Sequence, residues 1–350
     1  AAMKSMSVLI SGIQKERGIA FLYLTGAAAA DGIMATRHGV DEAWEAAAAP
    51  LAIKTLPESV APAVSGAVEE LGQLRRQVDD RSMMARSAYT EYIKIADAII
   101  EQMVELSKTD AAEASRQLES LVLYEKAKEN AGRVQCLASS IYSLDLPIQY
   151  QAILELVDAN AGITVNLRNG AANIGTEANV ALSELEISAE WYAMQDAVIE
   201  ILGMANVGGY GRDGLEFYKG TEAVAQKIQS IIDLVTSQTE TWFEIRSAAL
   251  ARTIVLTAAI LGVSVLFVLL VSVFMLSNIT GRIKEVAAGM KNVSSGDADL
   301  TRVIESRTKD ELGELSGYFN DFVGMLRGII DRVKTEVRAL GDGMIRLSSN

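Results

Sequence analysis

The segment 254-IVLTAAILGVSVLFVLLVSVFML-276 contains 23 residues and no charged side chain. At about 1.5 Å per residue, a helix of this length reaches about 35 Å, which exceeds the roughly 30 Å of a hydrocarbon core. A core helix of a soluble protein seldom stays apolar on every face over such a length. The segment therefore predicts one transmembrane helix over 253–276, with a long region before it and a short one after it.

The composition of the whole chain favours an all-α protein. It has only four prolines in 350 residues, and no Asn-Gly or Asp-Gly signal separates two β-branched runs. The single cysteine, Cys136, excludes an intrachain disulfide and any CxxC site. The single histidine, His38, leaves no histidine pair for a metal and argues against a Ser-His-Asp triad. We therefore expect neither an enzyme nor a cofactor.

The charge is distributed unevenly along the chain. The residues from Arg282 onward are neutral, with 11 Lys and Arg against 11 Asp and Glu, so the whole net charge of −13 lies before them. An acidic region has no general attraction for nucleic acid. If the N-terminal part binds an anion, it must do so through a local pocket.

The polar run 14-QKER-17 interrupts an otherwise apolar helical pattern near the N-terminus. On a helix, positions three, four and seven apart share a face. Arg17 shares its face with four apolar residues, namely Ile10, Ile13, Phe21 and Leu24. Lys15 and Glu16 point elsewhere. Because an unpaired charge on an apolar stripe is costly, the pattern predicts either a partner carboxylate or a bound anion at Arg17.

Glycines, prolines and paired aspartates divide the region before the membrane segment into eight expected helices. They are expected over 3–35, 40–49, 57–79, 81–107, 109–143, 147–170, 176–205 and 211–252. Thr109 is expected to cap the fifth helix, with Glu113 near the capping-box position. Eight helices form two four-helix bundles, or one bundle with elaborations. The last helix is expected to continue directly into the membrane segment.

Two runs with alternating steps of three and four residues follow the membrane segment, as in the a and d positions of a coiled coil. The first comprises Ile279, Ile283, Val286, Met290 and Val293. The second comprises Leu312, Leu315, Phe319, Phe322, Leu326, Ile329 and Val333. The polar connector between the runs is long enough for the two helices to lie parallel. Asp310 and Glu311 suit the positive N-terminus of the second helix.

The residues over about 279–332 resemble the HAMP domain. The resemblance rests on Gly296-Asp297 in the connector, on the box Asp310-Glu311-Leu312-Gly313 and on Phe319-Asn320. One departure is Gly281-Arg282, which stands where the family usually has a proline. The resemblance implies a parallel dimeric four-helix bundle that relays a transmembrane signal to a cytoplasmic output. An ordinary coiled-coil stalk is the alternative.

Two N-terminal stretches are similar to the nitrate- and nitrite-sensing (NIT) domain family. One is Gln14-Lys15-Glu16-Arg17-Gly18. The other is 128-KENAGRVQCLASSIYS-143, whose residues in register with the family are Glu129, Ala131 and Gly132. Val134 and Gln135 depart from it, because the family has glutamate and arginine there. The resemblance implies an all-helical domain of two bundles, within a sensor region over 1–250, that binds nitrate or nitrite through arginines between helices.

Six residues of these stretches are candidates for the ligand site, namely Arg17, Gln14, Glu129, Arg133, Gln135 and Ser139. A planar trigonal anion suits a guanidinium, which offers paired N–H donors in one plane. Gln135 and Ser139 would add neutral donors. Alternatives stay open, because Arg17 would equally form a structural bridge with Glu129. Arg133 would equally lie on the solvated surface, and Ser139 would equally mark a close helix contact.

Together these features predict the sensor, membrane and HAMP portions of a bacterial receptor that senses a small anion. The stretch 319-FNDFVGMLRGIIDRVKTEV-337 resembles the run from HAMP into the signalling helix of methyl-accepting chemotaxis proteins, which would begin within 333–350. That resemblance implies chemotaxis coupling and kinase proteins as partners of a region beyond this sequence. A histidine kinase or nucleotide cyclase output, and a sensor for a carboxylate or a protein, are the alternatives.

The predicted location is the inner (cell) membrane, with the sensor region periplasmic or extracellular and the HAMP region cytoplasmic. We expect a homodimer. Residues 1–10 lack the charged and apolar regions of a signal peptide. Because the sensor region must be exported, we expect that the sequence is a fragment lacking an earlier anchor.

Overall fold

A computed structural model describes residues 1–26, 28–54, 56–109, 111–172, 175–295, 299–301, 303–305 and 310–348. The described chain is helical and contains no strand. Its elements are α1 (Ala2–Leu24), α2 (Ala30–Leu51), α3 (Val60–Asp79), α4 (Ala85–Ser107), α5 (Ala112–Leu144), α6 (Tyr150–Leu167), the 3₁₀ turn η1 (Gly170–Ala172), α7 (Thr176–Glu186), α8 (Ala189–Met204), α9 (Gly214–Ser294) and α10 (Glu311–Ser348). The expected all-α class is confirmed. The chain forms two compact units, Ala1–Ala248 and Ala249–Asn350.

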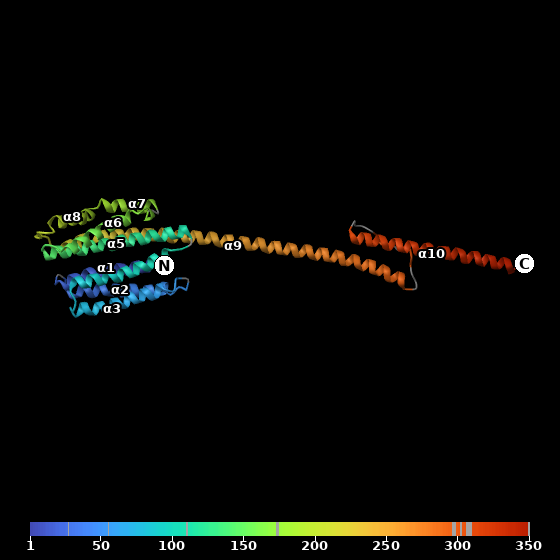
Figure 1. Ribbon diagram of the computed structural model, residues 1–350, viewed down its shortest axis with the longest axis horizontal. Helices are drawn as coiled ribbons and strands as arrows, with labels where there is room; N and C mark the ends of the chain where they lie inside the picture. Colours follow the sequence, from blue (N-terminus) through green and yellow to red (C-terminus); the bar gives the residue numbers. More distant parts are fainter. Residues whose placement is uncertain are drawn as a thin grey trace. The chain divides into compact units, whose positions relative to one another are not determined.

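The first unit consists of two layers of helices (Figure 1). In one layer α1 packs against α2 and α4, and α3 packs against α4. In the other layer α5 packs against α6 and α8. Helices α1 and α4 contact α5, so one continuous hydrophobic core joins the layers. The expected pair of helical bundles is therefore present, and the contact between α1 and α5 lies at its centre.

Helix α1 is buried around most of its circumference. Ile10 and Ile13 are fully buried on the predicted apolar face, and Arg17 is buried on the same face. Lys15 is exposed, as expected. Glu16, which was expected to point away from the buried face, is also fully buried. The expectation was wrong because α1 packs on two sides at once, against α5 and against the α2–α4 group.

The first expected helix is in fact two helices. Helix α1 ends at Leu24, where Gly26 turns the chain with φ +82°, and α2 starts at Ala30. The run of four alanines that follows Gly26 in the sequence hid this turn, since alanine favours helix everywhere. The expected break at His38-Gly39 is wrong because α2 continues through it, burying Val40 against α1. A glycine inside a helix costs only about 1 kcal/mol.

Two further boundaries differ from the prediction. The helix expected over 176–205 is split into α7 and α8, because the Ser188 side chain accepts a hydrogen bond from the Trp191 amide and starts a new helix. Helix α5 begins at Ala112 with Ala111 as its N-cap, so Thr109 does not cap it. The hydroxyl of Thr109 instead accepts a hydrogen bond from the Ala111 amide, and the neighbouring Asp110 lies outside the described residues.

Helix α9 is 81 residues long and contains the predicted membrane segment without a break. Within the described chain it is the one helix long and apolar enough to cross a membrane. None of its most apolar 18-residue window is buried against other parts of the protein. The expected continuity between the last sensor helix and the membrane segment is confirmed.

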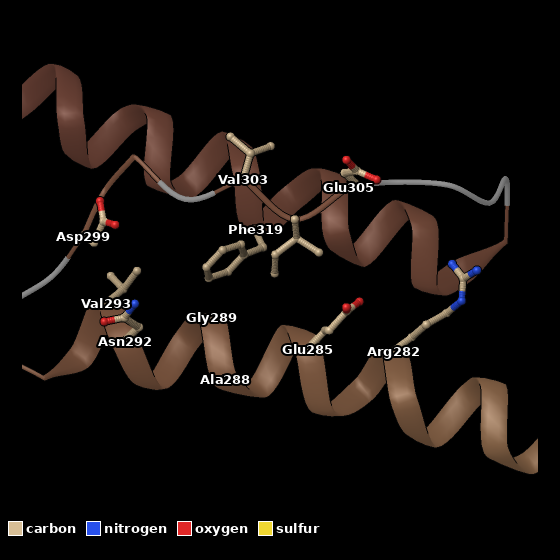
Figure 2. A pocket seen from close by; sticks show the side chains of 11 residues that line it. Arg282, Glu285, Ala288, Gly289, Asn292, Val293, Asp299, Val303, Glu305 and Phe319 are labelled. Carbon is tan, nitrogen blue, oxygen red and sulfur yellow. The ribbon is translucent and has the colours of Figure 1, made fainter.

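In the second unit, the C-terminal part of α9 and the N-terminal part of α10 lie parallel (Figures 1 and 2). Phe319 of α10 points toward Gly289 of α9, where a Cβ would stand 3.0 Å from the phenyl ring (Figure 2). The Asn320 side chain holds the connector through both backbone groups of Ile304, at 2.9 and 2.8 Å. Asp310 caps α10 by accepting a hydrogen bond from the Gly313 amide. Gly296-Asp297 lies outside the described residues.

A cavity of about 510 Å³ lies between these two helices and the connector (Figure 2). Its lining includes Arg282 and Glu285 on α9 and Val303 on the connector. The a and d residues of the two predicted runs are only partly covered within one chain, because Val286 and Phe319 are buried whereas Ile283, Phe322 and others are about half exposed.

Candidate functional site

The guanidinium of Arg17 lies in the interior of the first unit with one edge free. The residue is only 1% exposed. Its Nη1 donates to Oε1 of Glu129 on α5, whereas its buried Nε and Nη2 have no hydrogen-bond partner in the described chain. The Tyr89 ring lies 5.6 Å from the Arg17 Cζ atom. The free edge is the one whose two N–H groups point in the same direction, which is the geometry of bidentate binding.

The carboxylate of Glu129 is the acceptor around which the candidate residues gather. Besides Arg17, Gln14 donates to it at 2.9 Å and Arg133 at 2.8 Å. Burial alone would raise the pKa of Glu129, but the attraction of Arg17 and Arg133 outweighs burial and lowers it. The carboxylate is therefore ionised at neutral pH. The same attraction raises the pKa of Arg17 despite its burial.

Arg133 is half-buried and paired, and not a free surface residue. It bridges Glu129 to Asp97 of α4, with Nη2 at 2.5 Å from Oδ1 of Asp97. The two arginines and two carboxylates carry no net charge together. Burial raises the pKa of Asp97 although Arg133 opposes the shift. The cluster thus holds Arg17 in place while its Nε and Nη2 keep no hydrogen-bond acceptor in the described chain.

Two glycines give this cluster its close helix contacts. A Cβ at Gly132 of α5 would stand 2.8 Å from Nη2 of Arg17. A Cβ at Gly18 of α1 would stand 2.0 Å from the hydroxyl oxygen of Tyr218, which belongs to α9. Neither position accepts a side chain without moving its neighbour. Three helices therefore meet around Arg17.

A pocket of about 170 Å³ opens where α1, α5 and α9 meet. It is lined by Ser11, Gln14, Lys15, Lys128, Gly132, Gln135, Tyr218, Glu222, Ala225, Gln226 and Gln229. Gly132 lines this pocket and also lies against Nη2 of Arg17, whereas Arg17 itself does not line the pocket. The pocket therefore lies beside the Arg17 cluster and shares Gln14 and Gly132 with its surroundings.

The structure does not bring all six predicted site residues to the same point. Gln135 lines the pocket, but its amide donates to the backbone oxygen of Tyr218 at 2.6 Å. The Ser139 hydroxyl donates to the backbone oxygen of Gln135 on its own helix at 2.7 Å. Cys136 is buried, and burial raises the pKa of its thiol to about 12. Arg17, Gln14, Glu129 and Arg133 form the cluster, and Gln135 lies beside it.

A second polar cluster, which sequence reasoning missed, holds α1 against α2, α3 and α4. Glu16 accepts hydrogen bonds from Arg75 at 2.7 Å, from Arg37 at 3.3 Å and from the Tyr92 hydroxyl at 2.8 Å. Arg37 also donates to Asp79 at 2.7 Å. The run 14-QKER-17 could have indicated this cluster, because four consecutive residues point to every side of a helix. A helix that is buried all around must therefore bury some of these polar side chains.

Lys128 and Glu125 form a third buried polar group beside the pocket. The Lys128 ammonium lies 2.6 Å from the Glu125 carboxylate and donates to Ser11 and Gln229 at 2.7 and 2.6 Å. Ser7 donates to Glu125 at 2.7 Å. Gln229 belongs to α9, so this group also links α1, α5 and α9. In the described chain, no group of three or more His, Cys, Asp or Glu side chains is placed to hold a metal ion.

Comparison with known families identifies both units. A family model described as nitrate and nitrite sensing matches residues 8–251, and a HAMP domain model matches residues 274–328. The first match runs from residue 8, within α1, through α8 to residue 251 of α9, and it includes the Arg17 cluster. The second covers the helices and connector around Phe319.

Similar curated proteins are methyl-accepting chemotaxis proteins. The chain is 40% identical to TlpQ of Pseudomonas aeruginosa over 83 residues, which are 24% of this chain and 11% of that protein. It is 33% identical to McpA of Bacillus subtilis over 82 residues, 23% and 12% of the two chains. It is 26% identical to McpA of Pseudomonas putida over 191 residues, 53% and 26% of the two chains. The matched parts therefore span at most about a quarter of these relatives.

The solved structure of the NasR transcription antiterminator has a similar fold. The TM-score is 0.61 at 17% sequence identity, and the match covers 97% of this chain and 93% of that one. At this identity the similarity shows the fold alone.

Proposed function

Because the chain belongs to the nitrate and nitrite sensing family, we propose that its first unit binds nitrate or nitrite at the free edge of Arg17. The observation that carries this proposal is the pair of buried donors, Nε and Nη2, that have no partner in the described chain. A buried donor without an acceptor costs about 1–3 kcal/mol, and more when it is charged. A bound anion would remove that cost.

The shape of the free edge favours a planar anion. The two N–H groups are parallel and coplanar, so two oxygens of nitrate or nitrite would accept both hydrogen bonds at once. Glu129 accepts from Nη1, which is not one of the two free donors, so it orients Arg17 without taking either of them. Gln14 and Arg133 in turn fix Glu129.

The chain as a whole is a transmembrane receptor with a sensor unit, a membrane helix and a HAMP domain. We propose that anion binding displaces the first part of α9 relative to α1 and α5. The displacement would pass along the same helix to the HAMP unit, because α9 is continuous to Ser294. A ligand shifts such an equilibrium only by its differential affinity for the two states, and a tenfold difference corresponds to about 1.4 kcal/mol.

The proposed functional form is a homodimer that signals to a chemotaxis pathway. The half-exposed a and d residues of α9 and α10, such as Ile283 and Phe322, would be covered by the same residues of a second copy in a parallel bundle. The resemblance to methyl-accepting chemotaxis proteins supports a signalling helix that continues α10 and engages coupling and kinase proteins. No step of this relay requires catalysis by the chain itself.

We propose that the sensor unit lies outside the cytoplasm. Single cysteines at exposed Glu69 and Arg332, introduced into a variant in which Cys136 is replaced by Ala, would report the orientation. In intact cells a membrane-impermeant maleimide should label the cysteine at 69 and leave the one at 332 unlabelled until the membrane is opened. The reverse pattern would contradict the proposed orientation.

Calorimetric titration of the full chain in detergent micelles or nanodiscs tests the ligand. Nitrate and nitrite should bind, whereas acetate and chloride, at the same ionic strength, should bind more weakly or not at all. Arg17→Lys keeps the charge but loses the planar pair of donors, so it should lose nitrate binding. Arg212→Lys, at an exposed arginine paired with Glu200, is the matched control and should bind like the wild type.

A double variant that removes both charges of the Arg17–Glu129 pair distinguishes loss of binding from loss of folding. Removing Arg17 alone would leave Glu129 buried and unpaired, which typically destabilises a protein by about 3–5 kcal/mol. The double variant Arg17→Met with Glu129→Gln avoids the unpaired charge and should fold without binding nitrate. Glu129→Gln alone keeps the free edge and should retain measurable binding. Unchanged nitrate affinity in the double variant would rule out Arg17 as the site.

The proposed output is tested with a hybrid receptor. Residues 1–332 joined to the cytoplasmic signalling region of TlpQ should change the activity of the associated chemotaxis kinase when nitrate is added. The same hybrid with Arg17→Lys should not respond. A hybrid that binds nitrate but leaves the kinase unchanged would argue for a different output.

A further inference from the structure

Tyr218 connects the sensor pocket to the helix that enters the membrane. It lies near the start of α9, and its backbone oxygen accepts the hydrogen bond from Gln135 of α5. Its hydroxyl lies directly over Gly18 of α1, at the position next to Arg17. The residue is 9% exposed and lines the same pocket as Gly132. One residue of α9 thus contacts both helices that form the Arg17 cluster, α5 through its backbone oxygen and α1 through its side chain.

The Tyr218 hydroxyl is available for a ligand. It makes no hydrogen bond within the described chain, and it is not among the fully buried side-chain atoms without a partner, so it keeps some access to the pocket that Tyr218 lines. Burial raises its pKa, and the charge of Arg17 opposes this shift only in part, so the group stays protonated at neutral pH. A neutral hydroxyl is a donor, and anions accept hydrogen bonds from it. The guanidinium edge of Arg17 and the Tyr218 hydroxyl are therefore two sets of donors without acceptors in the same region.

We propose that the Tyr218 hydroxyl donates a hydrogen bond to the anion held by Arg17, and that this bond makes α9 the helix that responds to the ligand. The inference rests on the proposed function and adds a ligand contact and the point at which the signal leaves the pocket. Arg17 and Glu129 belong to α1 and α5, which end within the sensor unit. Only through a contact such as that of Tyr218 does the anion act on α9 directly.

The test compares Tyr218→Phe with Tyr210→Phe in the full chain. Both variants remove a single hydroxyl. That of Tyr210 is buried without a hydrogen-bond partner in the described chain, and its ring packs against Tyr142. Tyr218→Phe should weaken nitrate binding about tenfold in calorimetry, since it removes one hydrogen bond to a charged group. Tyr210→Phe should leave the affinity unchanged. Without nitrate, neither variant should melt at a lower temperature than the wild type.

A second measurement separates ligand contact from packing. Hydrogen exchange of the full chain should show that nitrate protects the amides of the first turns of α9 in the wild type and in Tyr210→Phe. In Tyr218→Phe, saturating nitrate should still protect the amides around Arg17 while the protection of α9 is lost. A structural role of the hydroxyl would instead change exchange without nitrate.

The possible outcomes decide between the two proposals. If the wild type does not bind nitrate or nitrite, the proposed function fails and this inference fails with it. If the wild type binds and Tyr218→Phe binds with equal affinity and equal protection of α9, the inference alone is overturned. A melting temperature of Tyr218→Phe that falls without nitrate would assign the hydroxyl to packing and would also overturn it.

Discussion

Gly132 of α5 lies against Nη2 of Arg17 on α1, so closely that a Cβ at this position would stand 2.8 Å from the nitrogen. Gly132→Ala should therefore push the guanidinium away from its place. We expect a loss of about 1–3 kcal/mol in stability from overpacking, and the loss of nitrate-dependent stabilisation. Thermal melts followed by circular dichroism with and without nitrate measure both effects.

The matched control for this substitution is Gly72→Ala. Gly72 lies inside α3, and a Cβ there would meet nothing within 4 Å. Alanine favours the helix by up to about 1 kcal/mol over glycine, so the control should be slightly more stable than the wild type. Nitrate should stabilise it as it does the wild type. A Gly132→Ala variant that behaves like the control would contradict the close contact with Arg17.

Glu16 should be among the residues most important for the stability of the first unit. Glu16→Gln removes the charge that pairs with Arg37 and Arg75, leaving both arginines short of a buried partner. We expect a loss of about 3 kcal/mol, the usual scale for breaking a buried ion pair. Glu69→Gln on the exposed face of α3 should change stability by less than about 0.5 kcal/mol. Denaturant titration of the two variants checks the difference.

The dependence of stability on pH should distinguish Glu129 from Glu125. The pKa of Glu129 is lowered in the folded protein, so its contribution is present above the ordinary value of 4.5 and is lost as the pH falls. Burial raises the pKa of Glu125 despite Lys128, so its contribution has the opposite sign. Between pH 7 and pH 3, Glu129→Gln should flatten the fall in melting temperature and Glu125→Gln should steepen it. Equal slopes would contradict these assignments.

The rate at which a thiol reagent labels Cys136 should report how readily the core between α1 and α5 opens. Cys136 is only 3% exposed, and its burial raises the pKa of the thiol to about 12. A maleimide should therefore react slowly with the folded protein at pH 8. In denaturant the reaction should be fast. Because Cys136 lies one turn from Gly132 and the Arg17 site, bound nitrate should slow labelling further. Rapid labelling of the native chain would show that the core between α1 and α5 opens readily.

The connector of the HAMP unit should depend on Asn320. Its side chain satisfies both the N–H and the oxygen of Ile304. Asn320→Ala leaves both groups without this partner, so we expect faster hydrogen exchange at the Ile304 amide and a loss of about 1–3 kcal/mol in the second unit. Asn292→Ala, on α9 beside the cavity, is the control. Exchange at Ile304 that does not change would contradict the role of this side chain.

The sequence allowed the main features to be predicted where one physical rule dominates. The uncharged run of membrane length lies in one helix, α9, as predicted. The arginine on the apolar stripe, Arg17, is buried, and the heptad runs form the paired parts of α9 and α10. Side-chain direction was harder to predict. Gln135 was expected at the ligand, but an acceptor on α9 that is distant in sequence, the oxygen of Tyr218, takes its amide.

The residues that were missed share a cause. Glu16 of α1 contacts Tyr92 of α4, and Tyr218 of α9 contacts Gly18 of α1. The periodicity of a single helix does not show which other helices pack against it. Helix ends were also uncertain where strong helix formers cross a turn, as around Gly26. Tertiary packing decided these features, and a single sequence carries little information about it.

Helix α9 is unbroken from Gly214 to Ser294, so an insertion within it rotates the later residues of the helix about its axis by a calculable angle. Each residue of a helix advances the phase by about 100°, so one residue inserted near 245 would turn everything after it by more than a quarter circle. Seven inserted residues make nearly two whole turns and would almost restore the original phase. The number of inserted residues therefore sets the angle through which the later part of α9 is rotated.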